Sequence, residues 1–167
     1  MRTNLLMDFS VDHANKKINV TRAFAAPLAK VWAAWTQSEL LEQWFAPKPW
    51  RAKTKSMDFR PGGFWLYAMV GPDGSEHWAR ADYKSIQEMN SFTVYDAFCD
   101  PEGNINTALP RSLWTNKFTE DAGKTIVTME IAYDTLEDLE QIIALGFKEG
   151  FIAAMENLDA LYSDNKI

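Results

Sequence analysis

Two polar side chains interrupt apolar strand faces in this sequence and could therefore contact a bound molecule. Asp96 lies on the apolar face of an expected strand at residues 92–98, and Asn116 lies between Trp114 and Phe118 on the next strand. Side chains alternate between the two faces of a strand, so both polar groups are expected inside an apolar layer. Buried polar groups need hydrogen-bond partners. Either this pair orients the polar end of a ligand, or it bonds to the backbone, to water or to each other.

A second polar group lies on the strand expected at residues 77–86. Alternation places Trp78, Arg80 and Asp82 on one face of that strand. If this face points inward, Arg80 and Asp82 can pair and hold an anionic group of a ligand. If it points outward, they are ordinary surface charges. The sequence leaves the direction open.

The residue types that most often bind metals or act as nucleophiles are sparse and scattered. His13 and His77 fall in different expected elements. No His-x-x-x-His or Cys-x-x-Cys spacing, nucleophile elbow or phosphate-binding loop occurs. The sequence shows no base that would activate Cys99. We therefore predict no catalytic residue, no metal and no cofactor, and the pattern favours a binding protein over an enzyme.

Composition argues against several classes of partner. The chain has 167 residues, 47% hydrophobic and 13% aromatic, which suits one domain (residues 1–167) with a single core. The net charge is -6 without a run of Lys or Arg, so nucleic acid and anionic membranes are poor partners. No apolar run approaches the ~20 residues of a membrane span, and the N-terminus lacks a signal-peptide pattern. The single cysteine cannot form an internal disulfide, which fits a cytoplasmic location.

Alternating apolar residues and turn signals predict an antiparallel sheet. A loose hairpin over residues 7–22 comes first, then a helix opened by Pro27 and a second short helix that Ser38 can cap. Short turns between the later strands make consecutive strands antiparallel. These strands are expected at residues 50–59, 64–70, 77–86, 92–98, 113–119 and 125–133.

The C-terminal region predicts one long amphipathic helix. Thr135-Leu136-Glu137-Asp138 reads as a capping box, and apolar residues continue at helical spacing to Tyr162, about seven turns later. We expect this helix, residues 136–162, to lie unbroken on the concave side of the sheet. A second apolar row, Ile142, Leu145 and Ile152, could pack under a loop or against a second subunit in a homodimer.

Four motifs occur in order along the chain. They are Thr21-Arg22-Ala23-Phe24-Ala25-Ala26-Pro27 with Val31-Trp32-Ala33-Ala34-Trp35-Thr36, then Asp58-Phe59-Arg60-Pro61-Gly62-Gly63, Gly123-Lys124-Thr125 and Gly146-Phe147-Lys148-Glu149-Gly150-Phe151. Together, over roughly residues 15–163, they resemble the family related to the activator of heat-shock protein 90 ATPase. That family belongs to the START-like, Bet v 1-like (SRPBCC) superfamily.

The resemblance implies an α+β helix-grip fold. In that fold a curved antiparallel sheet wraps around a long C-terminal helix, and two short helices follow the first strand region. Superfamily members bind apolar or amphipathic ligands between sheet and helix, and a minority are enzymes such as polyketide cyclases. The sequence departs from the family where Ser85 stands in place of a frequent Glu. The true co-chaperone also has a separate N-terminal client-binding domain, which we do not expect here, so the family name does not imply a chaperone role.

We therefore predict binding of a small apolar or amphipathic molecule between the sheet and the C-terminal helix. One alternative is a cyclase- or hydrolase-type enzyme in which Asp96, Asn116, Arg80 or Tyr67 would act as acid–base or oxyanion groups. Another is a co-chaperone-like interaction module. The predicted ligand-binding residues come from strand alternation and from family position. They are Trp65, Tyr67, Met69, Trp78, Arg80, Asp96, Trp114, Asn116, Phe118, Met129, Phe147 and Phe151.

Overall fold

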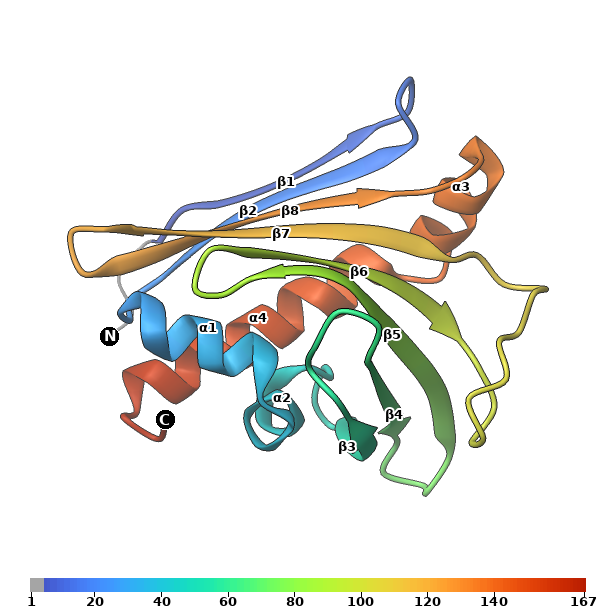
Figure 1. Cartoon of the computed structure of the whole chain (residues 1–167), viewed down its shortest axis with the longest axis horizontal. Helices are drawn as coiled ribbons and strands as arrows, with labels where there is room; N and C mark the ends of the chain where they lie inside the picture. Colours follow the sequence, from blue (N-terminus) through green and yellow to red (C-terminus); the bar gives the residue numbers. More distant parts are fainter. Residues whose placement is uncertain (1–4) are drawn as a thin grey trace.

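The computed structural model describes residues 5–167 as an α+β fold with one eight-stranded antiparallel sheet. The strand order is β1-β2-β8-β7-β6-β5-β4-β3, and the sheet curves around α1 and α4 (Figure 1). This is the helix-grip architecture predicted above. The strands are β1 (Met7–Asp12), β2 (Lys17–Phe24), β3 (Arg51–Met57), β4 (Phe64–Val70), β5 (Glu76–Gln87), β6 (Ser91–Phe98), β7 (Ser112–Asp121) and β8 (Lys124–Ala132). The helices are α1 (Leu28–Thr36), α2 (Ser38–Trp44), α3 (Leu136–Ala144) and α4 (Phe147–Ser163).

The concave face of the sheet carries the apolar core. Val94 pairs with Trp114 and Trp114 pairs with Ile131, so these three side chains form one row across β6, β7 and β8. All three are buried, as are Val127 and Met129 on β8. The alternation predicted for these strands is therefore confirmed, and it sets which residues face α4.

The C-terminal segment forms two helices, so the prediction of one unbroken helix is wrong. α3 ends at Ala144, α4 begins at Phe147, and Gly146 between them has φ 90°. This left-handed backbone conformation ends a helix and favours glycine. The fold assignment stands because α4 lies on the concave side next to α1, whereas α3 lies beyond the end of β8 (Figure 1).

The two predicted helix caps had different outcomes. The Thr135 side chain accepts a hydrogen bond from the backbone N–H of Asp138 at 3.0 Å, which confirms the start of α3. Ser38 is instead the first residue of α2, and its predecessor Gln37 makes no side-chain capping bond. Ser38 therefore does not cap that helix.

Three polar contacts fix the C-terminal half of α4. Arg22 on the concave face of β2 forms a buried ion pair with Asp159, with 3.8 Å between nitrogen and oxygen. Asn157 donates to the backbone oxygen of Ala46 at 2.9 Å, after α2. Tyr162 donates to the backbone oxygen of Lys30 at 3.1 Å, in α1. The N-terminal half of α4 contacts the sheet through Phe147 and Phe151, whose rings meet Trp114 on β7.

The Pro-Gly-Gly turn between β3 and β4 is tied to β5. Gly62 donates to the backbone oxygen of Tyr83, and Tyr83 donates to the backbone oxygen of Gly63, both at 3.0 Å. A Cβ atom on Gly63 would lie 2.1 Å from the backbone oxygen of Asp58, so only glycine fits there. Arg60 pairs with Asp58 at 2.6 Å on the exposed side of this turn.

The second apolar row predicted along the C-terminal helix is not a continuous exposed face. Ile142 is buried, Ile152 packs against the core, and Leu145 is 64% exposed. The break at Gly146 separates these side chains, which a continuous helix would have aligned.

None of the helices within residues 5–167 is long and apolar enough to cross a membrane.

Candidate functional site

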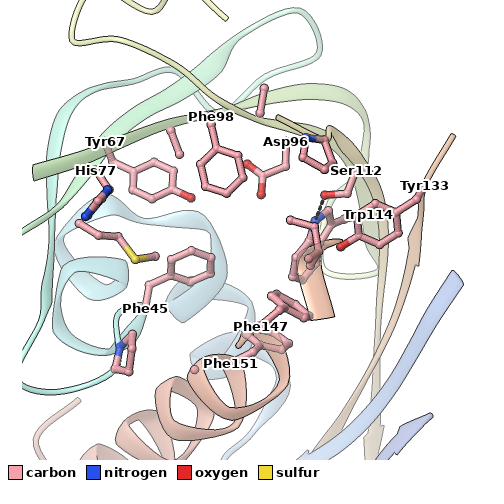
Figure 2. A pocket seen from close by; sticks show the side chains of 17 residues that line it. Phe45, Tyr67, His77, Asp96, Phe98, Ser112, Trp114, Tyr133, Phe147 and Phe151 are labelled. Carbon is pink, nitrogen blue, oxygen red and sulfur yellow. Dashed lines mark hydrogen bonds between the residues drawn. The ribbon is translucent and has the colours of Figure 1, made fainter. Parts of the chain in front are cut away.

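A pocket of about 280 Å³ lies between the concave face and the N-terminal half of α4 (Figure 2). Strands β4, β5, β6 and β7 supply one wall, and α3, α4 and the segment after α2 supply the other. The lining side chains labelled in Figure 2 are Phe45, Tyr67, His77, Asp96, Phe98, Ser112, Trp114, Tyr133, Phe147 and Phe151. We call this space the main pocket.

Aromatic rings form much of the lining. Phe147 and Phe151 stand one turn apart on α4 and stack at 5.3 Å with 16° between their planes. Trp114 meets Phe151 edge-on, with centroids 5.3 Å apart. Phe45, which follows α2, contacts Tyr67 edge-on at 5.9 Å. Packed rings of this kind hold one another in place and present an apolar surface to the pocket.

A second space of about 50 Å³ adjoins the main pocket. Both spaces are lined by Phe45, Tyr67, Asp96 and Trp114, so these four residues stand at the junction. Trp65, Asn116 and several core residues complete the smaller space, which we call the side pocket.

Asp96 is the acidic group at that junction. Its Oδ1 atom is buried and has no hydrogen-bond partner within residues 5–167. Burial raises the pKa of its carboxyl to about 7, while the backbone N–H of Ala97 and the charge of Arg111 oppose the shift. The group can therefore be either neutral or ionised near neutral pH.

The charge of Asp96 acts on three tyrosine hydroxyls, those of Tyr67, Tyr83 and Tyr133. The Tyr67 ring points across the main pocket with its oxygen on the Asp96 side (Figure 2). Burial, and then the charge of Asp96, raise the pKa of Tyr67 well above its usual value, so the phenol stays protonated. Burial also raises the pKa of Tyr133. Ser112 accepts a hydrogen bond from Trp114 Nε1 at 3.0 Å, which orients the indole in the wall.

The predicted ligand-binding residues separate into four groups. Six of them line the main pocket, and Tyr67, Asp96 and Trp114 among these also border the side pocket. Trp65 and Asn116 line the side pocket, and Asn116 Oδ1 is buried without a partner in the described chain. Phe118 and Met129 are buried in the core and border neither space. The six in the main pocket are Tyr67, Met69, Asp96, Trp114, Phe147 and Phe151.

Trp78 and Arg80 make up the fourth group, because they face away from both pockets. In β5 the inward positions are Ala79, Ala81 and Tyr83, so the alternative in which Arg80 points outward is correct. Lys55 lies over the Trp78 ring on this outer side, at 5.8 Å.

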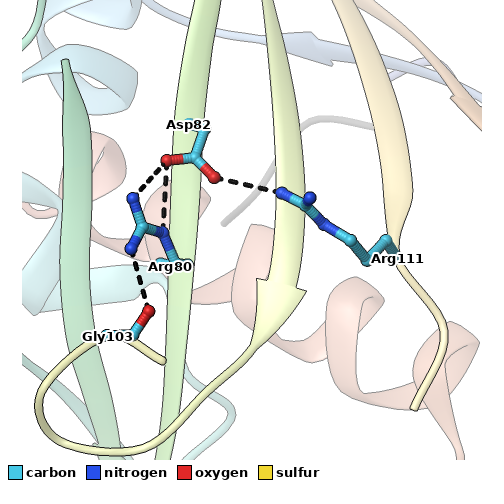
Figure 3. Close-up of polar contacts among 4 residues, drawn as sticks. All are labelled: Arg80, Asp82, Gly103 and Arg111. Carbon is cyan, nitrogen blue, oxygen red and sulfur yellow. Dashed lines mark hydrogen bonds and ion pairs between the residues drawn. The ribbon is translucent and has the colours of Figure 1, made fainter. Parts of the chain in front are cut away.

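Arg80 belongs to a cluster of charges on the convex face (Figure 3). Asp82 accepts hydrogen bonds from Arg80 at 2.7 and 3.2 Å and from Arg111 at 3.0 Å. Arg80 also donates to the backbone oxygen of Gly103 at 2.9 Å. These contacts attach the loop between β6 and β7 to the outside of the sheet.

Sequence reasoning missed several lining residues. Ala79 and His77 follow from alternation once the inward face of β5 is known, and Ser112 pairs with Asp96 across β6 and β7. Phe45 had no usable signal, because it follows α2 and reaches the pocket through tertiary packing.

The described residues contain no group of three or more His, Cys, Asp or Glu side chains arranged to hold a metal ion. Cys99 is partly buried, and burial raises the pKa of its thiol. A raised pKa lowers the fraction of reactive thiolate at neutral pH.

A curved sheet that holds a C-terminal helix and leaves a pocket beside it defines a helix-grip domain. The family model described as activator of Hsp90 ATPase homolog 1-like protein matches residues 25–163. The chain belongs to this family, as its four motifs predicted.

Solved structures show the same fold. A crystal structure of a protein from Mycobacterium smegmatis is 33% identical with a TM-score of 0.86, covering 95% of this chain and 96% of that one. A solution structure of a protein from Arthrobacter aurescens is 26% identical with a TM-score of 0.88, covering 94% and 91%. One from Staphylococcus epidermidis is 29% identical with a TM-score of 0.81, covering 93% and 94%. Comparison with curated proteins gave no match.

Proposed function

We propose that this protein binds a small, mainly apolar molecule in the main pocket, between the sheet and α4. The observation that carries the proposal is an aromatic-lined space of about 280 Å³ that the protein's own side chains leave unfilled. An engineered cavity of roughly 150 Å³ with an apolar lining stays dry and binds benzene. The main pocket is larger and suits a molecule of two fused rings or comparable size.

Burial of apolar surface would supply most of the affinity. Each Å² of apolar area removed from water contributes about 25 cal/mol, before the costs of immobilising the ligand. Phe147 and Phe151 are already packed against Trp114, so little side-chain ordering remains to oppose binding. The few polar groups at the junction would then set the ligand's orientation.

The first experiment fills the pocket. Ala79 lines the main pocket from β5, so Ala79→Phe places a ring in the ligand's space. The probe is 1-methylnaphthalene, with binding followed by calorimetry and by native mass spectrometry. We expect wild-type binding and at least about tenfold weaker binding by Ala79→Phe.

The matched control is Ala108→Phe, since Ala108 is exposed in the loop before β7. This variant should bind as wild type does. No binding of 1-methylnaphthalene, or of lipid and sterol probes, to wild-type protein would contradict the proposal. Equal affinity of both variants for 1-methylnaphthalene would show that the molecule binds outside the main pocket.

One observation also favours an acid–base enzyme that uses the same pocket. Asp96 has a pKa of about 7 and faces the Tyr67 side of the main pocket. General acid–base groups work best when their pKa lies near the working pH. Turnover of a bound carbonyl or ester compound that Asp96→Asn abolishes would support this alternative, whereas unchanged recovery of every bound compound would support simple binding.

A further inference from the structure

The polar atoms left unpartnered at the two pockets are both hydrogen-bond acceptors. Asp96 Oδ1 and Asn116 Oδ1 are each buried, and neither has a partner within the described chain. Both residues line the side pocket, and Asp96 also borders the main pocket. A buried acceptor without a donor costs free energy, so the missing partner is expected to be a donor.

The surroundings of Asp96 favour a donor that carries positive charge. Neither pocket has a lysine or arginine in its lining. The arginine whose charge acts on Asp96 is Arg111, and its guanidinium is bound to Asp82 on the opposite face. An ammonium group at the junction would meet a carboxylate without competing for it with a cation of the protein.

Aromatic rings strengthen this preference. Phe45, Tyr67 and Trp114 surround the same junction, and aromatic faces attract cations through their negative quadrupole. The interaction is stronger where water is excluded. An anionic ligand would instead meet the negative faces of the rings and the carboxylate, so we expect such ligands to be rejected.

We propose that the ligand is an amine with an apolar body, and that its protonated nitrogen binds the carboxylate of Asp96 at the junction of the two pockets. This inference rests on the proposed function, because the apolar body must occupy the main pocket. That body would lie against Met69, Phe147 and Phe151, which line the main pocket and not the side pocket. Asn116 offers a separate acceptor further along the side pocket, at the level of Phe92.

The binding should be coupled to proton release. In the empty pocket burial holds the pKa of Asp96 near 7, and an adjacent ammonium lowers it, so the carboxyl ionises when the amine arrives. Amine affinity should therefore rise with pH through neutrality. The titratable or charged groups that face Asp96 or influence it are Tyr67 on β4, His77, Asp82 and Tyr83 on β5, Cys99 after β6, Arg111 before β7 and Tyr133 after β8.

The test uses four probes that share one ring system: 1-naphthylmethylamine, 1-naphthalenemethanol, 1-methylnaphthalene and 1-naphthoic acid. Calorimetry on the wild-type protein at pH 8 should rank the amine first and the acid last. In Asp96→Asn the amine should bind at least about tenfold more weakly, because a neutral amide replaces the charged partner. The hydrocarbon should bind wild type and Asp96→Asn within about twofold.

Two control variants separate the pocket from general charge effects. Asp8→Asn removes one exposed carboxylate on β1 and should keep the wild-type ranking. His77→Gln alters the lining of the main pocket and can change the affinity at any one pH, so its readout is the ratio of amine affinities at pH 8 and pH 6, which should match that of the wild type. That pH dependence should disappear in Asp96→Asn.

Each outcome decides between the two proposals. If the alcohol or the hydrocarbon binds as tightly as the amine, the amine inference is overturned and the apolar binding function is kept. If none of the four binds, both fail. If Asp96→Asn no longer binds the hydrocarbon either, the variant cannot isolate the role of the charge. The pH dependence of amine affinity in the wild-type protein then decides, and an affinity that does not change with pH overturns the role of Asp96.

Discussion

Asp82 and Asp96 lie on neighbouring strands, β5 and β6, and face opposite sides of the sheet. Asp82 is on the convex face, where it accepts three hydrogen bonds from Arg80 and Arg111 (Figure 3). Asp96 is on the concave face, where one of its oxygens has no partner in the described chain and burial raises its pKa. The same residue type is thus fully paired on one side and poorly paired on the other.

The charge cluster on the convex face has a structural role. The Arg80 guanidinium lies 4.3 Å from the Phe64 ring centroid, and that of Arg111 lies 3.8 Å from the Tyr95 ring centroid. Together with the bond to Gly103, these contacts hold the loop between β6 and β7 on the sheet. Both oxygens of Asp82 are paired, although Arg111 Nε is a buried donor without a hydrogen-bond partner in the described chain.

The concave arrangement lacks a comparable structural explanation. A buried carboxyl with an unpartnered oxygen destabilises the folded state once it is ionised. Groups of this kind concentrate at functional sites, because binding or catalysis supplies the missing partner. The difference between the two aspartates is therefore the main physical reason to place the site at the junction of the pockets.

The largest effect expected from this comparison is a pH-dependent gain of stability in Asp96→Asn. The folded pKa of about 7 lies above the usual 3.8, so the native state binds more protons between these values. The free energy of unfolding of the wild type should therefore fall as pH rises from about 4 to 7. The variant should be more stable at pH 8 by up to about 4 kcal/mol, and the gain should vanish near pH 4.

Urea unfolding from pH 4 to pH 8 measures this difference. Asp8→Asn, which changes an exposed side chain on β1, should follow the wild-type curve. A loss of stability in Asp96→Asn at pH 8 would show that the Asp96 carboxylate has a partner in solution, and the contrast with Asp82 would disappear.

A smaller and opposite effect is expected on the convex face. Asp82→Ala removes three hydrogen bonds and leaves two arginines without their shared carboxylate. Because these side chains are about one-fifth exposed, we expect a loss of about 1–2 kcal/mol. Amide hydrogen exchange should accelerate in the loop around Gly103, which the cluster attaches to the sheet.

The exposed pair of Asp58 and Arg60 provides the matched control. Its nitrogen–oxygen distance is 2.6 Å, but both side chains are more than half exposed. Asp58→Ala should therefore cost no more than about 0.5 kcal/mol. Equal losses in Asp58→Ala and Asp82→Ala would show that the convex cluster contributes no more than a surface ion pair.

Strand alternation predicted the concave aspartate correctly but could not orient the strand beside it. Asp96 shares its face with Phe92 and Val94, so the apolar side of β6 was evident. On β5 the small side chains of Ala79 and Ala81 point inward, while Trp78 points outward. Small inward residues leave room for the pocket, but they also remove the hydrophobic contrast from which a facing direction is predicted.

The two largest errors have different physical causes, one a contact between distant parts of the chain and the other a local backbone conformation. Arg80 is half-buried on the outer face because the loop that contains Gly103 folds over it. The sequence around Arg80 does not predict where that distant loop lies. The helix break depends on Gly146 adopting a left-handed conformation, which sequence permits but does not require. Phe45 likewise enters the pocket through the packing of α2.

The smallest effect expected is on ligand affinity in Arg80→Met. Methionine keeps much of the apolar stem that covers Phe64, so the loss of stability should stay near 1 kcal/mol. Because the side chain faces away from both pockets, affinity for 1-methylnaphthalene should change by less than about twofold. Calorimetry on Arg80→Met and Ala79→Phe compares how substitutions at adjacent positions, on opposite faces of β5, change the affinity for 1-methylnaphthalene. A tenfold loss in Arg80→Met would mean that the convex cluster shapes the pocket through the sheet, and the two faces could then no longer be treated as independent.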